Sequence, residues 1–162
     1  KLIRRVLSRE VTMPPTSLQY LFSSDRGIHQ LEIEDLLSEG NTVVTDRYFW
    51  SSVAYGLSYL EGQIDFYLAA FSVLSNYHQF IIPDITFFLD LPVNIANDRI
   101  SKSHKHKEIY DNKTKLVKID HSYKQLIEKF RDEIVVVDAK RPVEKVSQEI
   151  LNTVYSILNT KK

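Results

Sequence analysis

Apolar residues along this chain follow two spacings, and each spacing predicts a different kind of element. Spacing of three or four positions predicts helices over 1–9, 16–39, 65–77, about 118–131, after Pro92 and from Pro142 onward. Short β-branched or aromatic runs predict strands over 42–45, 85–89 and 134–137. Strands that alternate with helices indicate a parallel sheet with right-handed crossovers.

The helix predicted over 16–39 carries two different faces. Thr16 is placed to cap its start, and Gly40 follows its last residue, where glycine commonly ends a helix. One set of apolar side chains predicts a buried stripe: Leu18, Leu21, Ile28, Leu31 and Leu36. Phe22 and Arg26 share another face because they lie four residues apart, with Gln19 one turn earlier. This second face is either a core aromatic residue beside a solvated charge or part of a binding site.

The composition is that of an ordinary globular protein of one domain, because 43% of the 162 residues are apolar and 26% are charged. Lysine plus arginine equals aspartate plus glutamate at 21 each, so net charge gives no reason to expect nucleic acid or a membrane as a partner. The chain has no cysteine, which excludes disulfides and thiolate chemistry and fits an intracellular protein. Its four glycines do not form a phosphate loop of the GxxxxGK(S/T) kind.

The first predicted strand leads directly into Asp46-Arg47-Tyr48, the strongest candidate for chemistry. In open parallel sheets, ligands bind at the carboxyl ends of the strands. There Asp46 is able to hold a hydrated Mg²⁺, and Arg47 is able to grip phosphate oxygens. The simpler alternative is a surface ion pair between these two residues. The other strand ends, Asp90 and Asp138, favour turn or capping chemistry.

Residues 101–118 are rich in lysine, with five lysines between 102 and 115, and show almost no apolar periodicity. Such a stretch is either a solvated loop or a mobile lid that brings positive charge onto a phosphorylated ligand. His104 and His106 have no carboxylate or cysteine at metal-ligand spacing, so no metal site is expected there.

Five motifs, in collinear order, resemble those of thymidylate kinases, the P-loop nucleoside monophosphate kinases that phosphorylate dTMP. They are Leu21-Phe22-Ser23-Ser24-Asp25-Arg26, Asp46-Arg47-Tyr48 with Ser51 and Ala54-Tyr55, Pro83-Asp84-Ile85-Thr86 through Leu89-Asp90, Glu108-Ile109-Tyr110-Asp111, and Val136-Val137-Asp138-Ala139. The resemblance covers essentially the whole chain. It implies an α/β fold of three layers, a P-loop NTPase-like parallel sheet with helices on both faces, and transfer of a phosphoryl group from ATP to dTMP.

The resemblance also implies roles on the dTMP side of the site. Phe22 would stack on thymine, Arg26 would bond its carbonyl edge, and Ser51, Tyr55 and Tyr110 would complete the substrate contacts. Asp46 and Arg47 would be the catalytic pair, with Arg47 on the acceptor phosphate and Asp46 in the Mg²⁺ shell.

Further roles concern the lid and the ATP side. The implied lid, about 101–118, includes Lys105, Lys107, Glu108 and Asp111, and the adenine side includes Ala139, Lys140 and Arg141. A cytoplasmic homodimer is expected, with the helices over 16–39 and 65–77 as candidate surfaces.

The sequence departs from the family pattern at two places. The family's P-loop and first two strands have no counterpart in these residues, although in the family the first strand lies between the strands that here end at Asp46 and Asp90. We therefore expect an N-terminally incomplete domain with an open place in its sheet. Ile109 stands where the lid often carries arginine, so Lys105, Lys107 or a P-loop arginine would supply that charge.

Two alternative functions stay open. A deoxynucleoside kinase of the same fold would carry Glu-Arg-Ser where this chain has Asp46-Arg47-Tyr48, which counts against it. The second alternative is a non-catalytic nucleotide-binding protein without a P-loop.

Overall fold

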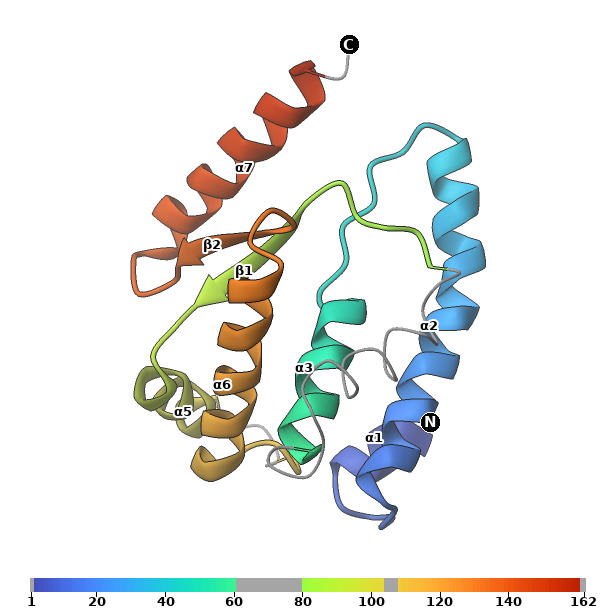
Figure 1. Ribbon diagram of the computed structural model, residues 1–162, viewed down its shortest axis with the longest axis vertical. Coiled ribbons are helices and arrows are strands. Elements are labelled where there is room, and N and C mark those ends of the chain that lie inside the picture. The colour runs from blue at the N-terminus through green and yellow to red at the C-terminus, as the bar shows by residue number, and fades with distance from the viewer. Residues whose placement is uncertain (1, 61–79, 104–107, 161–162) are drawn as a thin grey trace.

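The computed structural model describes residues 2–60, 80–103 and 108–160, and Figure 1 shows how their elements are arranged. In chain order these elements are α1 (Leu2–Leu7), α2 (Pro15–Ser38), α3 (Phe49–Leu60), β1 (Thr86–Asp90), α5 (Val93–Lys102), α6 (Lys113–Lys129), β2 (Ile134–Asp138) and α7 (Val143–Thr160). The helix predicted over 65–77 lies outside the described residues. Within the described part of the chain, no helix has both the length and the apolar character needed to cross a membrane.

Strands β1 and β2 form a parallel sheet, as the alternation of strands and helices predicts. Thr86 pairs with Ile134 at one end and Asp90 with Asp138 at the other. The chain between the strands passes through α5 and α6, because parallel strands require a long crossover. Both predicted strands end, as expected, in an aspartate at the carboxyl edge of the sheet.

The strand predicted over 42–45 is not formed, and this prediction was wrong. These residues lack regular secondary structure between α2 and α3, and Val44 is 89% exposed. A strand is held by backbone hydrogen bonds to a neighbouring strand, and in the described residues the sheet contains only β1 and β2. β-branched composition favours a strand, but the preference is realised only where a partner strand is present.

Helices lie on both sides of the sheet, which confirms the predicted α/β class. On one side α3 and α6 pack together and share a core with β2, made of Phe49, Trp50, Val53, Ala54, Leu57, Leu126 and Ile134. Phe88 of β1 packs against this core. Helix α7 contacts β2 from the opposite side, and α2 lies beside α3, farther from the sheet (Figure 1).

The start of α2 differs from the prediction. Pro14 occupies the N-cap position and no side chain caps the helix, so Thr16 is not the cap. Proline suits the beginning of a helix because the first N–H groups have no intrahelical partner. At the other end Gly40 adopts φ +80°, and its N–H bonds the Leu37 carbonyl, as predicted for a glycine that ends a helix.

The buried stripe predicted on α2 is largely wrong. Leu18 is only 2% exposed, but Ile28 and Leu31 are 72% and 66% exposed. The helix instead turns Arg26 and Gln30 toward the α3 segment, where they bond Ser52 and Tyr48. Polar hydrogen bonds therefore set the rotation of α2, and they leave its most apolar face uncovered by the described residues.

Helix α6 is longer than predicted, and helix α3 was not among the predicted helices. Helix α6 begins at Lys113 rather than near 118, because the Asn112 side chain accepts a hydrogen bond of 2.9 Å from the Thr114 N–H and so caps the start. Helix α3 continues through Gly56. A glycine inside a helix costs only about 1 kcal/mol, which the surrounding packing offsets.

Candidate active site

Arg47 occupies a strained turn immediately before α3. Its backbone lies in the left-handed region at φ +70°, which costs a non-glycine residue about 1–2 kcal/mol. Its Nη1 donates a 2.6 Å hydrogen bond to the Tyr55 hydroxyl, and its guanidinium carbon lies 5.2 Å from the centre of the Tyr55 ring. Such strain is often found at functional sites, although Arg9, outside the candidate site, also has a positive φ, at +65°.

Within the described residues Arg47 forms no salt bridge with Asp46, so the surface ion pair is not what orients it. Partial burial of the guanidinium opposes its charge, but the interactions with Tyr55, Tyr123 and Asp46 outweigh this effect and raise the pKa of Arg47. The side chain is therefore a permanent cation, and the Tyr55 hydroxyl accepts a hydrogen bond from it.

Phe22 and Arg26 lie together on α2, as their spacing predicts. The Arg26 guanidinium carbon is 5.6 Å from the centre of the Phe22 ring, and Arg26 also donates to the buried Ser52 hydroxyl on α3. Phe22 is partly buried and belongs to the same apolar cluster as Tyr55 and Tyr110. The structure thus brings the aromatic and cationic candidates of α2 next to those of α3.

Tyr110 joins this group from the turn before α6. Its ring meets the Tyr55 ring edge to face, with centres 4.7 Å apart and an angle of 84°. The residue is buried, and its hydroxyl has no hydrogen-bond partner of acceptable geometry in the described chain. Burial raises the pKa of Tyr110 well above its ordinary value, and the neighbouring Tyr59 phenol adds to the rise.

Ser51 is buried beneath the candidate site and does not line an open surface. It is 9% exposed, and its Oγ accepts a 2.8 Å hydrogen bond from the Tyr123 hydroxyl of α6. Burial raises the pKa of Tyr123, while the charges of Arg47 and Arg26 act in the opposite direction. Tyr123 was not predicted as a site residue, because sequence spacing does not show which face of α6 meets α3.

Asp46 and Arg26 border a shared hollow of about 360 Å³ between α2 and the segment that precedes α3. The lining also includes His29, Glu32, Ile33, Leu36, Val43, Thr45 and Tyr48. Tyr48 donates to the buried amide oxygen of Gln30 at 2.9 Å, which ties the segment to α2. Gln19 and Gln30 fall on the Phe22 and Arg26 face by helical spacing, so this periodicity could have identified Gln30.

The implied lid residues are only partly described. Lys105 and Lys107 lie outside the described residues. Glu108 and Asp111 form a closed turn, in which the Glu108 N–H donates to the Asp111 carboxylate at 2.8 Å. The Ile109 N–H donates to the Leu7 carbonyl at 3.0 Å, so this turn is attached to α1.

The three residues predicted for the adenine side form the loop between β2 and α7, apart from the dTMP-side cluster. Arg141 forms an ion pair with Glu149 and donates to the Asp138 carbonyl, and the Lys140 N–H bonds the Asp138 carboxylate. Arg99 of α5 donates to the Ala139 carbonyl at 3.3 Å. Arg99 was not predicted, because its position near the end of α5 gives no sign of the loop beside it.

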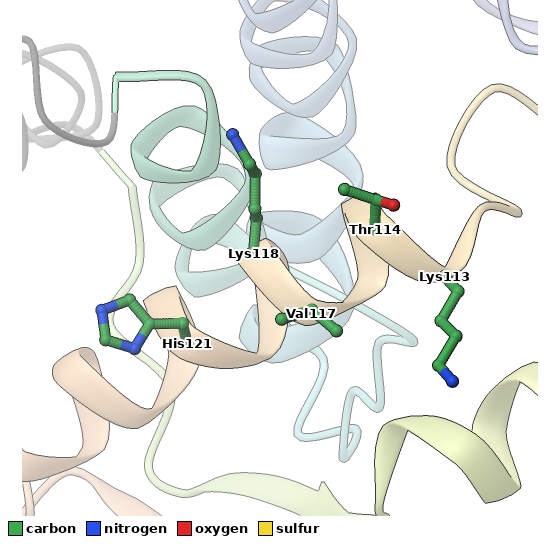
Figure 2. Close-up of a pocket in the computed structure, with 5 residues that line it drawn as sticks. All are labelled: Lys113, Thr114, Val117, Lys118 and His121. Carbon is green, nitrogen blue, oxygen red and sulfur yellow. The ribbon is translucent and has the colours of Figure 1, made fainter.

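The helix α6 surface carries a second hollow, of about 580 Å³, lined by Lys113, Thr114, Val117, Lys118 and His121. Figure 2 shows the ammonium groups of Lys113 and Lys118 pointing away from one another. The two cations therefore do not converge on a common anion, and this hollow is a weaker candidate than the Arg47 cluster.

Fold and site together define an α/β protein whose site combines two arginines with aromatic rings and a carboxylate, a set suited to an aromatic ligand that carries anionic charge. A family model described as thymidylate kinase matches residues 1–150. The thymidylate kinase of Plasmodium falciparum is 32% identical over 157 residues, which are 97% of this chain and 70% of that protein. The chain belongs to the thymidylate kinase family, a family of kinase transferases.

A solved structure gives the same fold. The structure of thymidylate kinase from Candida albicans superposes on this chain with a TM-score of 0.79. The match covers 98% of this chain and 74% of that chain at 23% identity, which establishes the similarity of the fold.

Proposed function

We propose that this protein transfers the γ-phosphoryl group of ATP to dTMP, giving dTDP. Phosphoryl transfer depends on positioning and on neutralising charge, with little covalent work for the protein. The observation that supports this function best is the gathering of Phe22, Arg26, Arg47, Tyr55 and Tyr110 by three separate segments of the chain. A site with these groups offers a stacking surface, a donor for a base and a cation for a phosphate.

On the substrate side, Phe22 stacks on thymine and Arg26 bonds the carbonyl edge of the base. Arg47 holds the acceptor phosphate, for which the planar guanidinium supplies paired donors. The rings of Tyr55 and Tyr110 border the sugar and base. Ser51 acts indirectly, because its hydroxyl already accepts a hydrogen bond from Tyr123.

Mg²⁺ is the cofactor that we propose to accompany ATP, and Asp46 fits it. Mg²⁺ is commonly bound by one or two carboxylates together with waters and substrate phosphates. Asp46 is exposed and borders a hollow. Within the described residues it forms no salt bridge. In residues 2–60, 80–103 and 108–160, no three His, Cys, Asp or Glu side chains gather into a site made by protein alone. When bound, the ion supplies positive charge to the phosphate oxygens.

ATP binds on the side of Ala139, Lys140 and Arg141, with Lys105, Lys107, Glu108 and Asp111 in the lid. The bonds from Arg141 to Asp138 and Glu149 support this role, because they fix the loop between β2 and α7 before a nucleotide arrives.

The phosphate loop that the family resemblance implies has no counterpart in these residues. In the described residues β1 pairs with β2 alone, and the β-branched segment over 42–45 pairs with no strand.

The substitution Arg47→Lys tests the proposed function, because it keeps the charge but removes the planar grip. A charge-assisted contact contributes about 1.5–3 kcal/mol, whereas an exposed ion pair contributes about 0–1 kcal/mol. In steady-state assays with ATP and Mg²⁺, we expect kcat/KM for dTMP to fall at least about tenfold. Thymidine binding, measured by calorimetry, should change much less, because thymidine has no phosphate.

Arg131→Lys, at an exposed position outside the site, is the matched control and should behave as the parent does. If Arg47→Lys phosphorylates dTMP at the parent rate, Arg47 does not hold the phosphate and the assignment of Asp46-Arg47-Tyr48 is withdrawn.

A cytoplasmic homodimer, formed through the exposed apolar face of α2, completes the proposal. Tyr20, Ile28 and Leu31 are 60%, 72% and 66% exposed on one face, and Gly27 among them leaves room for a close approach. A contiguous exposed apolar patch of this kind commonly marks a surface that contacts another protein. Sedimentation velocity should show a monomer for Ile28→Glu and a dimer for Val143→Glu, whose site on α7 is similarly exposed. A dimer in both variants would exclude this face.

A further inference from the structure

The Tyr55 hydroxyl contacts another side chain of the candidate site, the Arg47 guanidinium. We propose that Tyr55 is a positioning residue, whose hydroxyl holds the Arg47 guanidinium in the orientation that the acceptor phosphate requires. The inference rests on the proposed function of Arg47 as the phosphate-holding residue. It begins from the 2.6 Å hydrogen bond from Arg47 Nη1 to the Tyr55 hydroxyl, the side-chain hydrogen bond that orients this guanidinium in the described structure.

Tyr55 is itself held firmly enough to orient another side chain. It stands in the middle of α3, and its ring meets the ring of the buried Tyr110 at 84°. Lys115 approaches the Tyr110 ring, with its nitrogen 5.9 Å from the ring centre, and donates to the Ile109 carbonyl. The Tyr55 phenol is therefore a fixed acceptor, tied both to α3 and to the turn before α6.

Arg47, in contrast, depends on an external partner. The residue is exposed and lies in a left-handed turn outside the helix, so helical packing does not restrict its long side chain. A free arginine side chain loses rotamer freedom when a ligand orders it, and this loss weakens binding. Because the Tyr55 bond orders the guanidinium beforehand, the phosphate meets a cation that is already placed.

A phenol suits this task better than a carboxylate. Tyr55 accepts the bond through a hydroxyl oxygen rather than a carboxylate, so it orients Arg47 without pairing it with an acidic side chain. An aspartate or glutamate in the same place would also satisfy the guanidinium electrostatically and would compete with the phosphate. One donor of Arg47 is used by Tyr55, and a guanidinium has five, so a paired grip on a phosphate stays available.

Tyr55→Phe tests the role, because it removes the acceptor and keeps the ring, its contact with Tyr110 and its place under the guanidinium. Calorimetry on the full chain would compare dTMP with thymidine in the parent, Tyr55→Phe, Arg47→Lys and the double variant. We expect dTMP binding to weaken roughly 3- to 10-fold in Tyr55→Phe, with thymidine binding unchanged. In the Arg47→Lys background, Tyr55→Phe should have no further effect, because residues that act as one unit are not additive.

Tyr155→Phe removes an exposed hydroxyl on α7 and serves as the control. An equal loss for dTMP and thymidine would overturn the positioning role, since it would show that the Tyr55 hydroxyl contacts the nucleoside. The same loss with and without Arg47 would also overturn it. If the parent binds dTMP no more tightly than thymidine, the proposed function fails, and the role of Tyr55 fails with it.

Discussion

The Tyr123 hydroxyl of α6 donates a 2.8 Å hydrogen bond to Ser51 Oγ, and the next residue of α3, Ser52, accepts from Arg26 of α2. Two consecutive serines thus connect α3 to both of its neighbouring helices. Ser51 and Ser52 are 9% and 2% exposed, so both bonds are shielded from water. A buried polar group left without its partner costs about 1–3 kcal/mol, which makes these connections specific. The side chains of the site therefore stand on a scaffold whose helices are fixed relative to one another.

The first prediction concerns Phe22, which lies under the Arg26 guanidinium at the edge of the apolar cluster. Stacking of a base on an aromatic ring contributes about 1–3 kcal/mol, so Phe22→Ala should weaken dTMP binding roughly 5- to 150-fold. ATP affinity should stay nearly unchanged, because the residues proposed for the adenine side follow β2, away from Phe22. Calorimetric titration with each nucleotide provides the measurement.

An equal loss for dTMP and ATP would show that Phe22 is a core residue whose removal disturbs the whole fold. Thermal unfolding of the variant gives an independent reading of that possibility, and Tyr155→Ala, at an exposed aromatic position, provides the comparison.

The sequence predicts those parts of the fold that depend on local pattern. Strand β2 combines four consecutive β-branched residues with a partner in register, and it forms where expected. The segment over 42–45 has the same kind of composition but no partner strand among the described residues, and it forms no strand. Local pattern encodes a preference for extended structure, whereas a strand also needs hydrogen bonds from elsewhere in the chain.

A similar limit applies to the site. Helical spacing places Phe22 and Arg26 together, and the structure confirms this proximity. Spacing does not predict the hydrogen bond between Arg47 and Tyr55. This bond depends on a left-handed backbone at Arg47, which no residue type in this segment predicts. Likewise, the rotation of α2 follows from polar bonds across two helices rather than from its own apolar stripe.

The strained backbone of Arg47 leads to a second prediction, on stability. Arg47→Ala and Arg47→Gly remove the same bond to Tyr55, but only alanine keeps a Cβ in the left-handed region at φ +70°. Relief of that clash outweighs the greater flexibility of glycine in the unfolded chain, so the glycine variant should be more stable by about 0.5–1 kcal/mol. Urea unfolding of both variants measures the difference. A more stable alanine variant would indicate that Arg47 is not held at positive φ in solution.

The third prediction concerns the turn over 108–111 and its attachment to α1. Since the Ile109 N–H bonds the Leu7 carbonyl, its exchange with deuterium should already be slow without nucleotide. A bisubstrate analogue that joins dTMP to ATP should slow exchange further from Lys105 to Asp111, as a closing lid requires. Unchanged exchange in that range would reduce the lysine-rich stretch to a solvated loop.

A matched pair of variants tests the turn itself. Asp111→Asn keeps an oxygen that accepts the Glu108 N–H, whereas Asp111→Ala removes it. Faster exchange at Glu108 is expected in the alanine variant only.

The fourth prediction concerns Tyr110, whose buried hydroxyl lacks a partner in the described structure. Leaving a polar group buried and unpaired costs about 1–3 kcal/mol, so Tyr110→Phe should raise the free energy of unfolding near pH 7 by about 1 kcal/mol. If the hydroxyl serves the nucleoside, the same variant should bind dTMP and thymidine more weakly. Gain of stability with loss of binding would separate a ligand contact from a merely structural tyrosine.

The pH dependence of stability gives a further reading of the same variant. Burial raises the pKa of Tyr110 above its ordinary value, so above about pH 10 the unfolded chain releases this proton while the folded protein keeps it. The unfolded state then binds fewer protons, so the free energy of unfolding falls as the pH rises, at about 1.4 kcal/mol per pH unit. Tyr110→Phe should remove that share of the slope in urea unfolding above pH 10, whereas Tyr155→Phe, at an exposed tyrosine, should leave the slope unchanged. A destabilised Tyr110→Phe protein would show that the hydroxyl is hydrogen-bonded in solution, and its assignment to the substrate would be withdrawn. An unaltered alkaline slope would show that the pKa of Tyr110 is not raised in the folded protein.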